Sequence, residues 1–319
     1  MQYSLRTAHR LLQPGRWPDI DAHGGPRLAR LRFEESWHLW FLEAMAVAAF
    51  ARAIIDAPPS ATVLDVGANV GAYAVIGAAL NRTSTAVEMQ PACYDWIRTH
   101  AMQLDVPARV RIVTGYFEND TSPIRQNRGL LVPINDCSVL ASPSAVAGRW
   151  PHGLPTKATR MFVASPPPLK ETTRVFAINP GEILPVDGEL VVKIDTEGYE
   201  IQVLEALRLY WPRFAAVIFE VQPNAWKYSG VSPAQGLATV RALMQQEGLR
   251  AAALPHKNPR SAASTAEPAV FDPRAQRWLS ADAFATVLKD MLNFPGQGGW
   301  FREFALFRAP RDVFVDKYV

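Results

Sequence analysis

The sequence predicts a doubly wound α/β fold, in which a mostly parallel sheet carries helices on both faces. Short apolar runs rich in β-branched residues alternate with amphipathic segments along the chain. A glycine turn follows the first of these runs directly and leads into a segment of small residues. Because the runs are apolar throughout rather than alternating, we expect their strands to be parallel and buried on both sides.

The chain of 319 residues divides into a leader with one helix, residues 1–60, and one large domain, residues 61–319. Residues 1–32 are rich in Arg, Pro and Gly and show no periodicity. From residue 33 apolar side chains recur at steps of three and four, which predicts a helix that ends near Asp56. The aromatic side chains of this predicted helix would support a homodimer.

Within the large domain, the apolar patterns give the elements in order. Strands are expected at 62–67, 85–88, 110–113, 189–194, 215–220, 249–254 and 300–307. Helices are expected at 72–80, 199–209, 233–247 and 281–292, the third capped by Ser232 and stopped by Gly248. A segment rich in Pro, Ser, Ala and Gly at about 136–170 has no periodic signal, and we interpret it as an insertion that is either a lid or a surface excursion.

Composition narrows the possible partners. The formal net charge is +3, with no run of basic residues, so the sequence gives no electrostatic signature for nucleic acid or an anionic membrane. With no long apolar span and no apolar leader segment, we expect a cytoplasmic protein that does not enter the membrane. Cys93 and Cys137 lack metal-ligand spacing and are too few for a disulfide framework, so we expect a reducing compartment.

The glycine turn after the first strand is the first candidate binding site. Gly67 and Gly71 lie where a backbone must approach a ligand closely, and such turns present amide groups at a helix N-terminus. Those amides suit the carboxylate end of S-adenosylmethionine, and Asp65 suits its ammonium end, directly or through water. The alternative is an ordinary turn in which Asp65 caps the helix.

Glu88 ends the second strand, where an acidic residue accepts hydrogen bonds from both hydroxyls of an adenosyl ribose. Met89 is then placed to pack on adenine. Nicotinamide enzymes use the same acidic residue, but the turn lacks their G-x-G-x-x-G pattern and has Asn69 in place of a glycine. The turn therefore favours the sulfonium cofactor.

A second cluster of ionisable residues follows the fourth strand. Lys193, Asp195, Glu197 and Glu200 gather at the carboxyl end of that strand, the edge on which open α/β sheets bind ligands. Crowded carboxylates separate in pKa, so one can act as a base while another pairs with Lys193. The alternative is a helix N-terminus that simply favours acidic residues.

With this cluster and the glycine turn, the sequence resembles the FkbM family of methyltransferases. The resemblance rests on three strings in order, Val63–Gly71 (VLDVGANVG), Val87–Pro91 (VEMQP) and Val192–Glu200 (VKIDTEGYE), with the later VIFE at residues 217–220. It covers residues 61 to 222 and leaves the leader, the Pro-rich segment and the C-terminal region unmatched. One departure is Gln90, an extra residue before Pro91, which affects Met89 more than Glu88.

The resemblance implies a Rossmann-like class I methyltransferase fold with a seven-stranded sheet in the order 3-2-1-4-5-7-6. It implies S-adenosylmethionine as cofactor and O-methylation of a hydroxyl on a sugar, glycan or polyketide-like metabolite. The residues expected to bind the cofactor are Asp65, Gly67, Ala68, Asn69, Gly71, Glu88 and Met89.

Methyl transfer is an in-line displacement that needs an aligned acceptor and a base for its proton. Asp195 or Glu197 is the preferred base, with Lys193 orienting it, and Glu220 and His256 are expected to bind the acceptor. His256 is the other candidate base. We expect no metal, because no Asp-Asn pair follows the fifth strand, although Asp195 and Glu220 are possible ligands.

Three rival functions stay open at this stage. The same strand–helix–strand arrangement suits a nicotinamide-dependent oxidoreductase. A methyltransferase-like scaffold without turnover is disfavoured by the intact acidic residues. A nucleic-acid methyltransferase is disfavoured by the low net charge and by the missing Asn/Asp-Pro-Pro-aromatic string.

Overall fold

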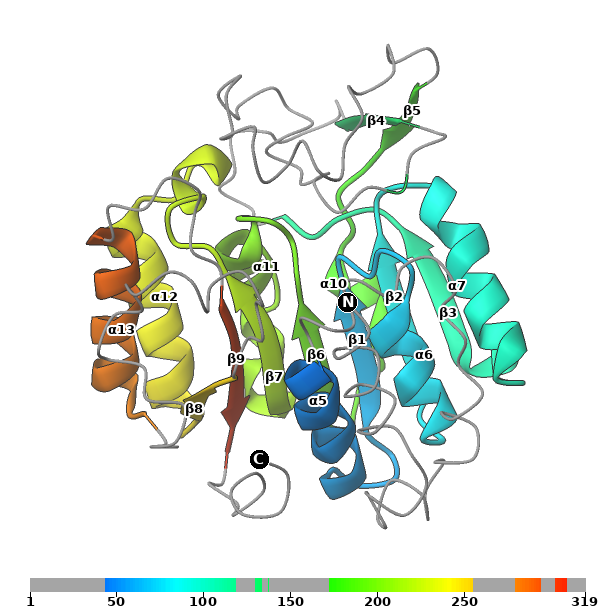
Figure 1. Cartoon of the computed structure of the whole chain (residues 1–319), viewed down its shortest axis with the longest axis horizontal. Coiled ribbons are helices and arrows are strands. Elements are labelled where there is room, and N and C mark those ends of the chain that lie inside the picture. Colours follow the sequence, from blue (N-terminus) through cyan, green and yellow to red (C-terminus); the bar gives the residue numbers. More distant parts are fainter. Residues whose placement is uncertain are drawn as a thin grey trace, which may run out of the picture.

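A seven-stranded sheet organises the protein (Figure 1). The computed structural model describes residues 44–118, 130–133, 137, 172–254, 279–293 and 302–308. In these residues the sheet order is β3-β2-β1-β6-β7-β9-β8, and β4 pairs with β5 separately. The strands are β1 (Thr62–Val66), β2 (Ser84–Glu88), β3 (Val110–Thr114), β4 (Leu130–Pro133), β5 (Thr172–Val175), β6 (Leu190–Ile194), β7 (Phe214–Val221), β8 (Arg250–Ala253) and β9 (Arg302–Phe307).

The strand order identifies the fold. Strands β1, β2, β3, β6 and β7 pair in parallel, while β9 runs antiparallel between β7 and β8. If only the strands of the main sheet are numbered, in chain order, the observed strand order is 3-2-1-4-5-7-6. This is the order of the class I methyltransferase fold, so the predicted fold class is confirmed.

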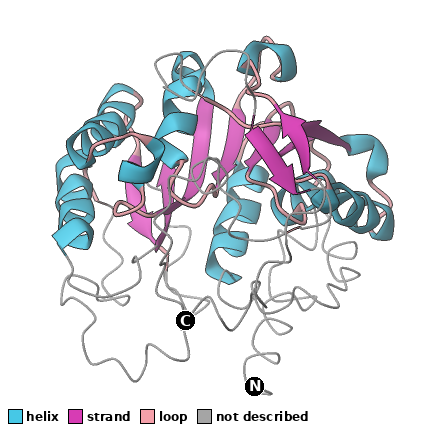
Figure 2. Ribbon diagram, turned by 90° about the horizontal axis from the view of Figure 1, so that it is seen from above, coloured by secondary structure: helices cyan, strands magenta, loops and turns pink. Residues whose placement is uncertain are grey.

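Helices cover both faces of the sheet, as Figure 2 shows from above. Every residue of β1, β2 and β6 is buried, which is why these strands lack a polar alternation. The helices are α5 (Ala44–Asp56), α6 (Ala72–Ala79), α7 (Ala92–Gln103), α10 (Pro180–Ile183), α11 (Glu200–Ala206), α12 (Pro233–Gln246) and α13 (Ala281–Asn293), with 3₁₀ turns at Pro107–Arg109, Arg208–Arg213 and Trp226–Ser229.

Two large apolar clusters form most of the core, one on each face, and a third, small cluster consists of Ala68, Ala74, Ala86 and Ile97. On one face α5 and α6 pack on the sheet, and Phe50, Val63 and Val191 belong to their cluster. On the other face α11, α12 and α13 pack around side chains such as Val192 and Phe219. Helix α5 belongs to residues 1–60, which were predicted to form a leader with one helix. It packs on the sheet of the large domain.

Several predicted boundaries are confirmed closely. Helix α12 begins at Pro233 after a capping box in which Ser232 Oγ accepts from Gln235 N and the Gln235 side chain accepts from Ser232 N. Gly248 follows the helix with φ +64°, a left-handed conformation that suits a helix stop. The predicted helix at 199–209 is shorter, because α11 ends at Ala206 and a 3₁₀ segment that contains Pro212 replaces its end.

Helix α7 was not predicted from the sequence. Its buried positions are Cys93, Ile97, His100 and Ala101, whereas the large side chains of Trp96 and Met102 are exposed. The spacing of these four residues is helical, but His100 interrupts the apolar pattern. The antiparallel pair β4–β5 was also not predicted, and Figure 1 shows it above the edge of the sheet where the parallel strands end.

The sequence predicted two unlinked cysteines in a reducing compartment. The first part of this prediction is wrong, because Cys93 and Cys137 form a disulfide. The two residues are 44 positions apart, but Cys137 lies next to the start of α7, with the two Cα atoms 5.0 Å apart. Sequence spacing does not reveal such a meeting, because it depends on the tertiary fold.

Some predicted features lie outside the described residues. These are the leader at 1–32, the start of the first predicted helix, the Pro-rich segment at about 136–170 apart from Cys137, and His256. Among the helices that the structure does describe, none combines the length and the apolar character needed to cross a bilayer.

The contact between α6 and the sheet gives a first testable prediction. A Cβ on Gly77 would lie 2.6 Å from Ser84 Oγ and 2.7 Å from Val63 Cγ2. Gly→Ala in a helix normally stabilises by about 1 kcal/mol. We expect Gly77→Ala instead to lower the free energy of unfolding by about 1–3 kcal/mol, because the buried contact leaves no room.

Urea denaturation followed by circular dichroism measures the effect of Gly77→Ala. Adding Val63→Ala should make the two losses less than additive, since the second change opens the space that the first one needs. A more stable Gly77→Ala protein would show that α6 does not pack on β1 as closely as described.

Candidate functional site

The two predicted clusters meet at the carboxyl edge of the sheet. Strands β1 and β6 are neighbours, and Asp65 is in register with Lys193. Beyond the strands the pairing continues, because Asp195 N donates to Val66 O at 2.9 Å. The glycine turn and the carboxylate cluster therefore share a backbone contact, as the sequence predicted for neighbouring strand ends.

The turn after β1 has a conformation that requires glycine. Gly67 has φ +76°, Asn69 φ +49° and Gly71 φ +79°. A Cβ on Gly67 would lie 1.8 Å from the carbonyl oxygen of Asp195, and a Cβ on Gly71 would lie 2.7 Å from Ile97. Close backbone approach is thus the reason for Gly67, and helix packing is the reason for Gly71.

Four amides of this turn donate hydrogen bonds within the protein. Gly67 N and Ala68 N both donate to Val87 O, and Gly71 N donates to Ala68 O. Asn69 N donates to Glu88 Oε2 at 2.7 Å. Each of these four amides thus has an acceptor in the protein, either in β2 or within the turn itself.

Asp65 is buried in the structure, with an exposed fraction of 1%. Its Oδ2 accepts from Ala74 N in the first turn of α6 at 2.9 Å, a contact that serves the helix end. Burial raises the pKa of Asp65 to about 7, against the opposing effects of the Ala74 N–H and of Lys193. This contact is the one that the alternative interpretation predicted, in which Asp65 caps the helix.

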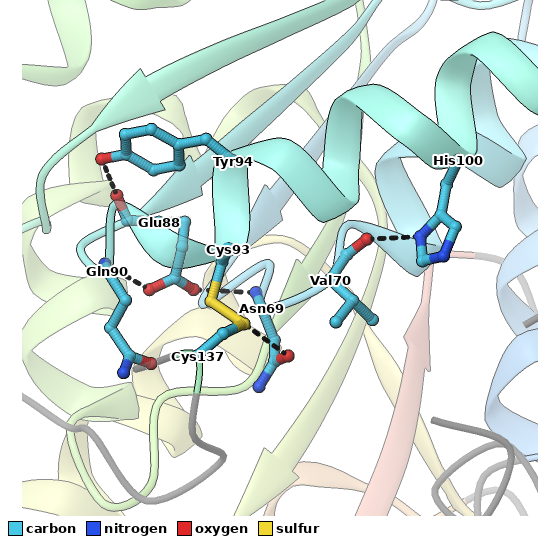
Figure 3. Close-up of a disulfide and its surroundings, with 8 residues drawn as sticks. All are labelled: Asn69, Val70, Glu88, Gln90, Cys93, Tyr94, His100 and Cys137. Carbon is cyan, nitrogen blue, oxygen red and sulfur yellow. Dashed lines mark hydrogen bonds between the residues drawn. A yellow bond between two sulfur atoms is a disulfide. The ribbon is translucent and has the colours of Figure 1, made fainter. Parts of the chain in front are cut away.

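Glu88 lies at the end of β2 and is also buried. Its two carboxylate oxygens accept from Asn69 N and from Gln90 N, the latter at 2.8 Å (Figure 3). Burial raises the pKa of Glu88, and these N–H donors oppose the shift. The Met89 N–H also lowers the pKa of Glu88. A carboxylate has about four acceptor positions, so some acceptor capacity remains for ligand hydroxyls.

Met89 is buried in the larger apolar cluster, together with Tyr116 and Phe117, which follow β3. These side chains form the apolar surroundings of the β2 and β3 ends. The extra residue Gln90 is itself buried rather than looped out.

Lys193 is a fully buried cation that connects the two clusters. Its Nζ lies 3.2 Å from Asp195 Oδ2 and 4.9 Å from the centroid of the Tyr73 ring. It also lowers the pKa of Asp65 through its charge. Because burying a lone ammonium is very unfavourable, Lys193 fixes the position of negative charge around it.

Three carboxylates gather beyond β6 and β7. One oxygen each from Asp195, Glu197 and Glu220 lies within 4.8 Å of the other two. Gln222 Nε2 donates to Glu197 Oε2 at 3.0 Å and to Glu220 Oε1 at 3.3 Å. The structure thus brings together three of the predicted residues.

Gln222 was missed by the sequence reasoning, although a signal was present. It lies two residues after Glu220, so the period of a strand places both side chains on the same side. Three carboxyl groups this close together favour a bound cation or bound hydroxyl groups, which would pair with their oxygens.

Glu200 holds the turn that carries Glu197. Its carboxylate accepts from Gly198 N at 2.6 Å and from Trp226 Nε1 at 3.1 Å, and burial raises its pKa to about 7. Glu197 and Gly198 have φ +52° and +92°, so this turn departs from ordinary helix geometry. Glu200 is the first residue of α11, and it stabilises the loop before the helix.

The chain was also compared with known families, curated proteins and solved structures. No model of a known protein family matches the chain, and no curated protein matches it. The chain is similar to a solved structure of geranyl diphosphate C-methyltransferase from Streptomyces coelicolor A3(2) in complex with Mg²⁺, geranyl diphosphate and S-adenosyl-L-homocysteine. The identity is 13%, over 97% of this chain and 98% of that chain, with a TM-score of 0.37.

A second similar structure is precorrin-6y C5,15-methyltransferase from Geobacter metallireducens GS-15. It is 10% identical over 82% of this chain and 87% of that chain, with a TM-score of 0.35. Because these TM-scores are low, the fold assignment rests on strand order and register. The resemblance to the FkbM family stays a prediction.

Proposed function

We propose that the protein is an S-adenosylmethionine-dependent methyltransferase that methylates a hydroxyl on a sugar, glycan or polyketide-like metabolite. The observation that supports this most is the contact between the two clusters. The turn at Gly67 lies against the backbone of Asp195, so a cofactor on the turn would lie next to the carboxylates after β6 and β7. Methyl transfer needs this proximity of donor and acceptor.

In this proposal the cofactor lies along the turn and the end of β2. Bound there, S-adenosylmethionine supplies an electrophilic methyl group. Glu88 accepts from the ribose hydroxyls with its remaining acceptor positions, and Asp65 balances the ammonium group. Met89 packs beside adenine, and Gly67, Ala68, Asn69 and Gly71 allow the close approach.

The acceptor lies over the three carboxylates. Asp195 or Glu197 removes the hydroxyl proton, and Lys193 orients Asp195 through their 3.2 Å contact. Glu220 and Gln222 hold further hydroxyl groups of the acceptor. On the sequence alone, His256 is also proposed to bind the acceptor. We further propose that the enzyme is cytoplasmic and can form a homodimer. It acts on a small molecule or glycan rather than on nucleic acid.

Calorimetric titration with S-adenosylhomocysteine tests the cofactor site. We expect micromolar binding by the wild-type protein and at least a tenfold loss in Glu88→Ala, because the ribose hydroxyls lose their acceptor. Glu182→Ala is the matched control, since Glu182 is an exposed glutamate on α10, and it should bind as the wild type does.

Absence of wild-type binding would contradict the proposal. A nicotinamide titration with a fluorescence readout then tests the oxidoreductase alternative. If binding is present, transfer of a labelled methyl group to a panel of sugars, glycans and polyketide-like alcohols identifies the acceptor. Binding without transfer to any hydroxyl or RNA acceptor would favour the scaffold alternative.

A further inference from the structure

The disulfide lies beside the proposed cofactor site (Figure 3). Cys93 is in the first turn of α7, three residues after Gln90, and is fully buried. Cys137 is partly exposed, and its Sγ lies 3.5 Å from Asn69 Oδ1. A disulfide sulfur has no proton, so this is a close sulfur–oxygen contact, and only the reduced thiol can donate a hydrogen bond here.

The disulfide and the Glu88 carboxylate both contact the cofactor turn at Asn69 and the region where α7 begins. Glu88 accepts from Asn69 N in the cofactor turn and from Gln90 N just before α7. The disulfide holds Cys137 to α7 at Cys93, while Cys137 contacts the Asn69 side chain. Asn69 is therefore held on its backbone by Glu88 and contacted on its side chain by the disulfide.

We propose that Cys93 and Cys137 form a redox-sensitive site, and that the disulfide form binds the adenosyl cofactor more tightly than the dithiol form. This inference rests on the proposed function, because it concerns the affinity of that same site. In a cytoplasmic setting disulfides are usually transient and redox-sensing, which agrees with a switch rather than a permanent crosslink.

The chemistry is thiol–disulfide exchange with a dithiol reductant. A thiolate of the reductant attacks Sγ of Cys137, the more accessible sulfur, and the Cys137–Cys93 bond breaks. The electron pair passes to Cys93 Sγ, which takes a proton. The second thiol of the reductant then attacks the mixed disulfide and releases Cys137 as a thiol. Two electrons and two protons pass to the protein, and the reductant becomes a disulfide.

The affinity changes because a pre-formed turn loses less freedom when it binds a ligand. Asn69 has a left-handed conformation that ordinary residues rarely adopt, so its position depends on the surrounding contacts. Reduction releases Cys137 from α7, so the contact between Cys137 and Asn69 is no longer held in place by a covalent bond. The backbone of the turn keeps its hydrogen bonds, but the Asn69 side chain then has to be ordered when the ligand binds.

The test is calorimetric titration of S-adenosylhomocysteine into the full chain, once oxidised and once after treatment with dithiothreitol. The chain contains two cysteines, so the reductant acts on this pair alone. Thiol counting and intact mass establish each state. We expect about tenfold weaker binding by the reduced protein, and recovery of affinity on reoxidation.

The Cys93→Ser, Cys137→Ser double variant is the control. It should bind as the reduced wild type does, in both the presence and the absence of dithiothreitol. If the variant does not fold, the reversible cycle of the wild type still decides the question. Equal or tighter binding by the reduced protein would overturn the inference alone, whereas no binding by either form would contradict the proposed function as well.

Discussion

Gly67→Ala is expected to weaken the binding of S-adenosylhomocysteine at least a hundredfold. Two effects combine at this position. The φ of +76° costs a residue with a Cβ about 1–2 kcal/mol. The added Cβ would also lie 1.8 Å from the carbonyl oxygen of Asp195, which belongs to the backbone and cannot rotate away. The turn has to move, and with it the proposed binding surface.

Gly248→Ala separates these two effects. Gly248 also has a positive φ, +64°, but no atom lies within 4 Å of its added Cβ. We expect this control to lose about 1–2 kcal/mol of stability and to keep its affinity for S-adenosylhomocysteine. Calorimetry and urea denaturation on both variants provide the comparison. Undiminished binding by folded Gly67→Ala would show that the ligand does not use this turn.

Asp65→Asn is expected to make the protein more stable at pH 8 and a weaker binder of the cofactor. The folded protein raises the pKa of Asp65 from 3.8 to about 7, so it binds this proton more tightly than the unfolded chain does. Unfolding therefore releases a proton between about pH 4 and pH 7, and the free energy of unfolding falls as the pH rises through that range. Above about pH 7 the free energy of unfolding has fallen by the full amount.

The asparagine carries no charge, so this loss disappears, while its side-chain oxygen still accepts from Ala74 N. We expect a gain of roughly 2–4 kcal/mol at pH 8 that declines towards pH 4, measured by urea denaturation at both ends. Glu200 is present in both proteins, so its own titration cancels. An unchanged stability at pH 8 would contradict the burial of an ionised Asp65.

The same change tests the proposed ammonium contact. Without the negative charge, binding of S-adenosylhomocysteine at pH 8 should weaken at least tenfold. In the wild type the affinity should fall below about pH 7, as Asp65 becomes protonated. An affinity that does not depend on pH would show that Asp65 serves only the end of α6.

Much of the fold was readable because the central strands are unambiguous. Val63, Val192 and Phe219 belong to runs so apolar that only a buried strand suits them, and Ser232 and Gly248 mark helix ends with specific backbone chemistry. The order of the strands came from the resemblance, and the pairing of β1 with β2 and β6 agrees with it.

The parts that the sequence did not reveal depend on tertiary contacts. Helix α7 buries His100 within its apolar stripe, so its periodicity is interrupted. The Cys93–Cys137 bond joins residues that only the folded chain brings together. In the site, strand positions predicted the meeting of Asp195 with Glu220, but the orientation of the turn amides towards Val87 is a backbone detail that residue types do not encode.

The placement of β9 has a consequence for how the chain folds during synthesis. Residues 302–307 pair with β7 on one side and β8 on the other, so a late segment of the chain occupies the interior of the sheet. Until the ribosome has released it, β7 has a free edge and the apolar face beneath α5 is incomplete. A nascent chain stalled before β9 would therefore expose an unpaired apolar strand, which is the kind of surface that chaperones bind and that promotes aggregation.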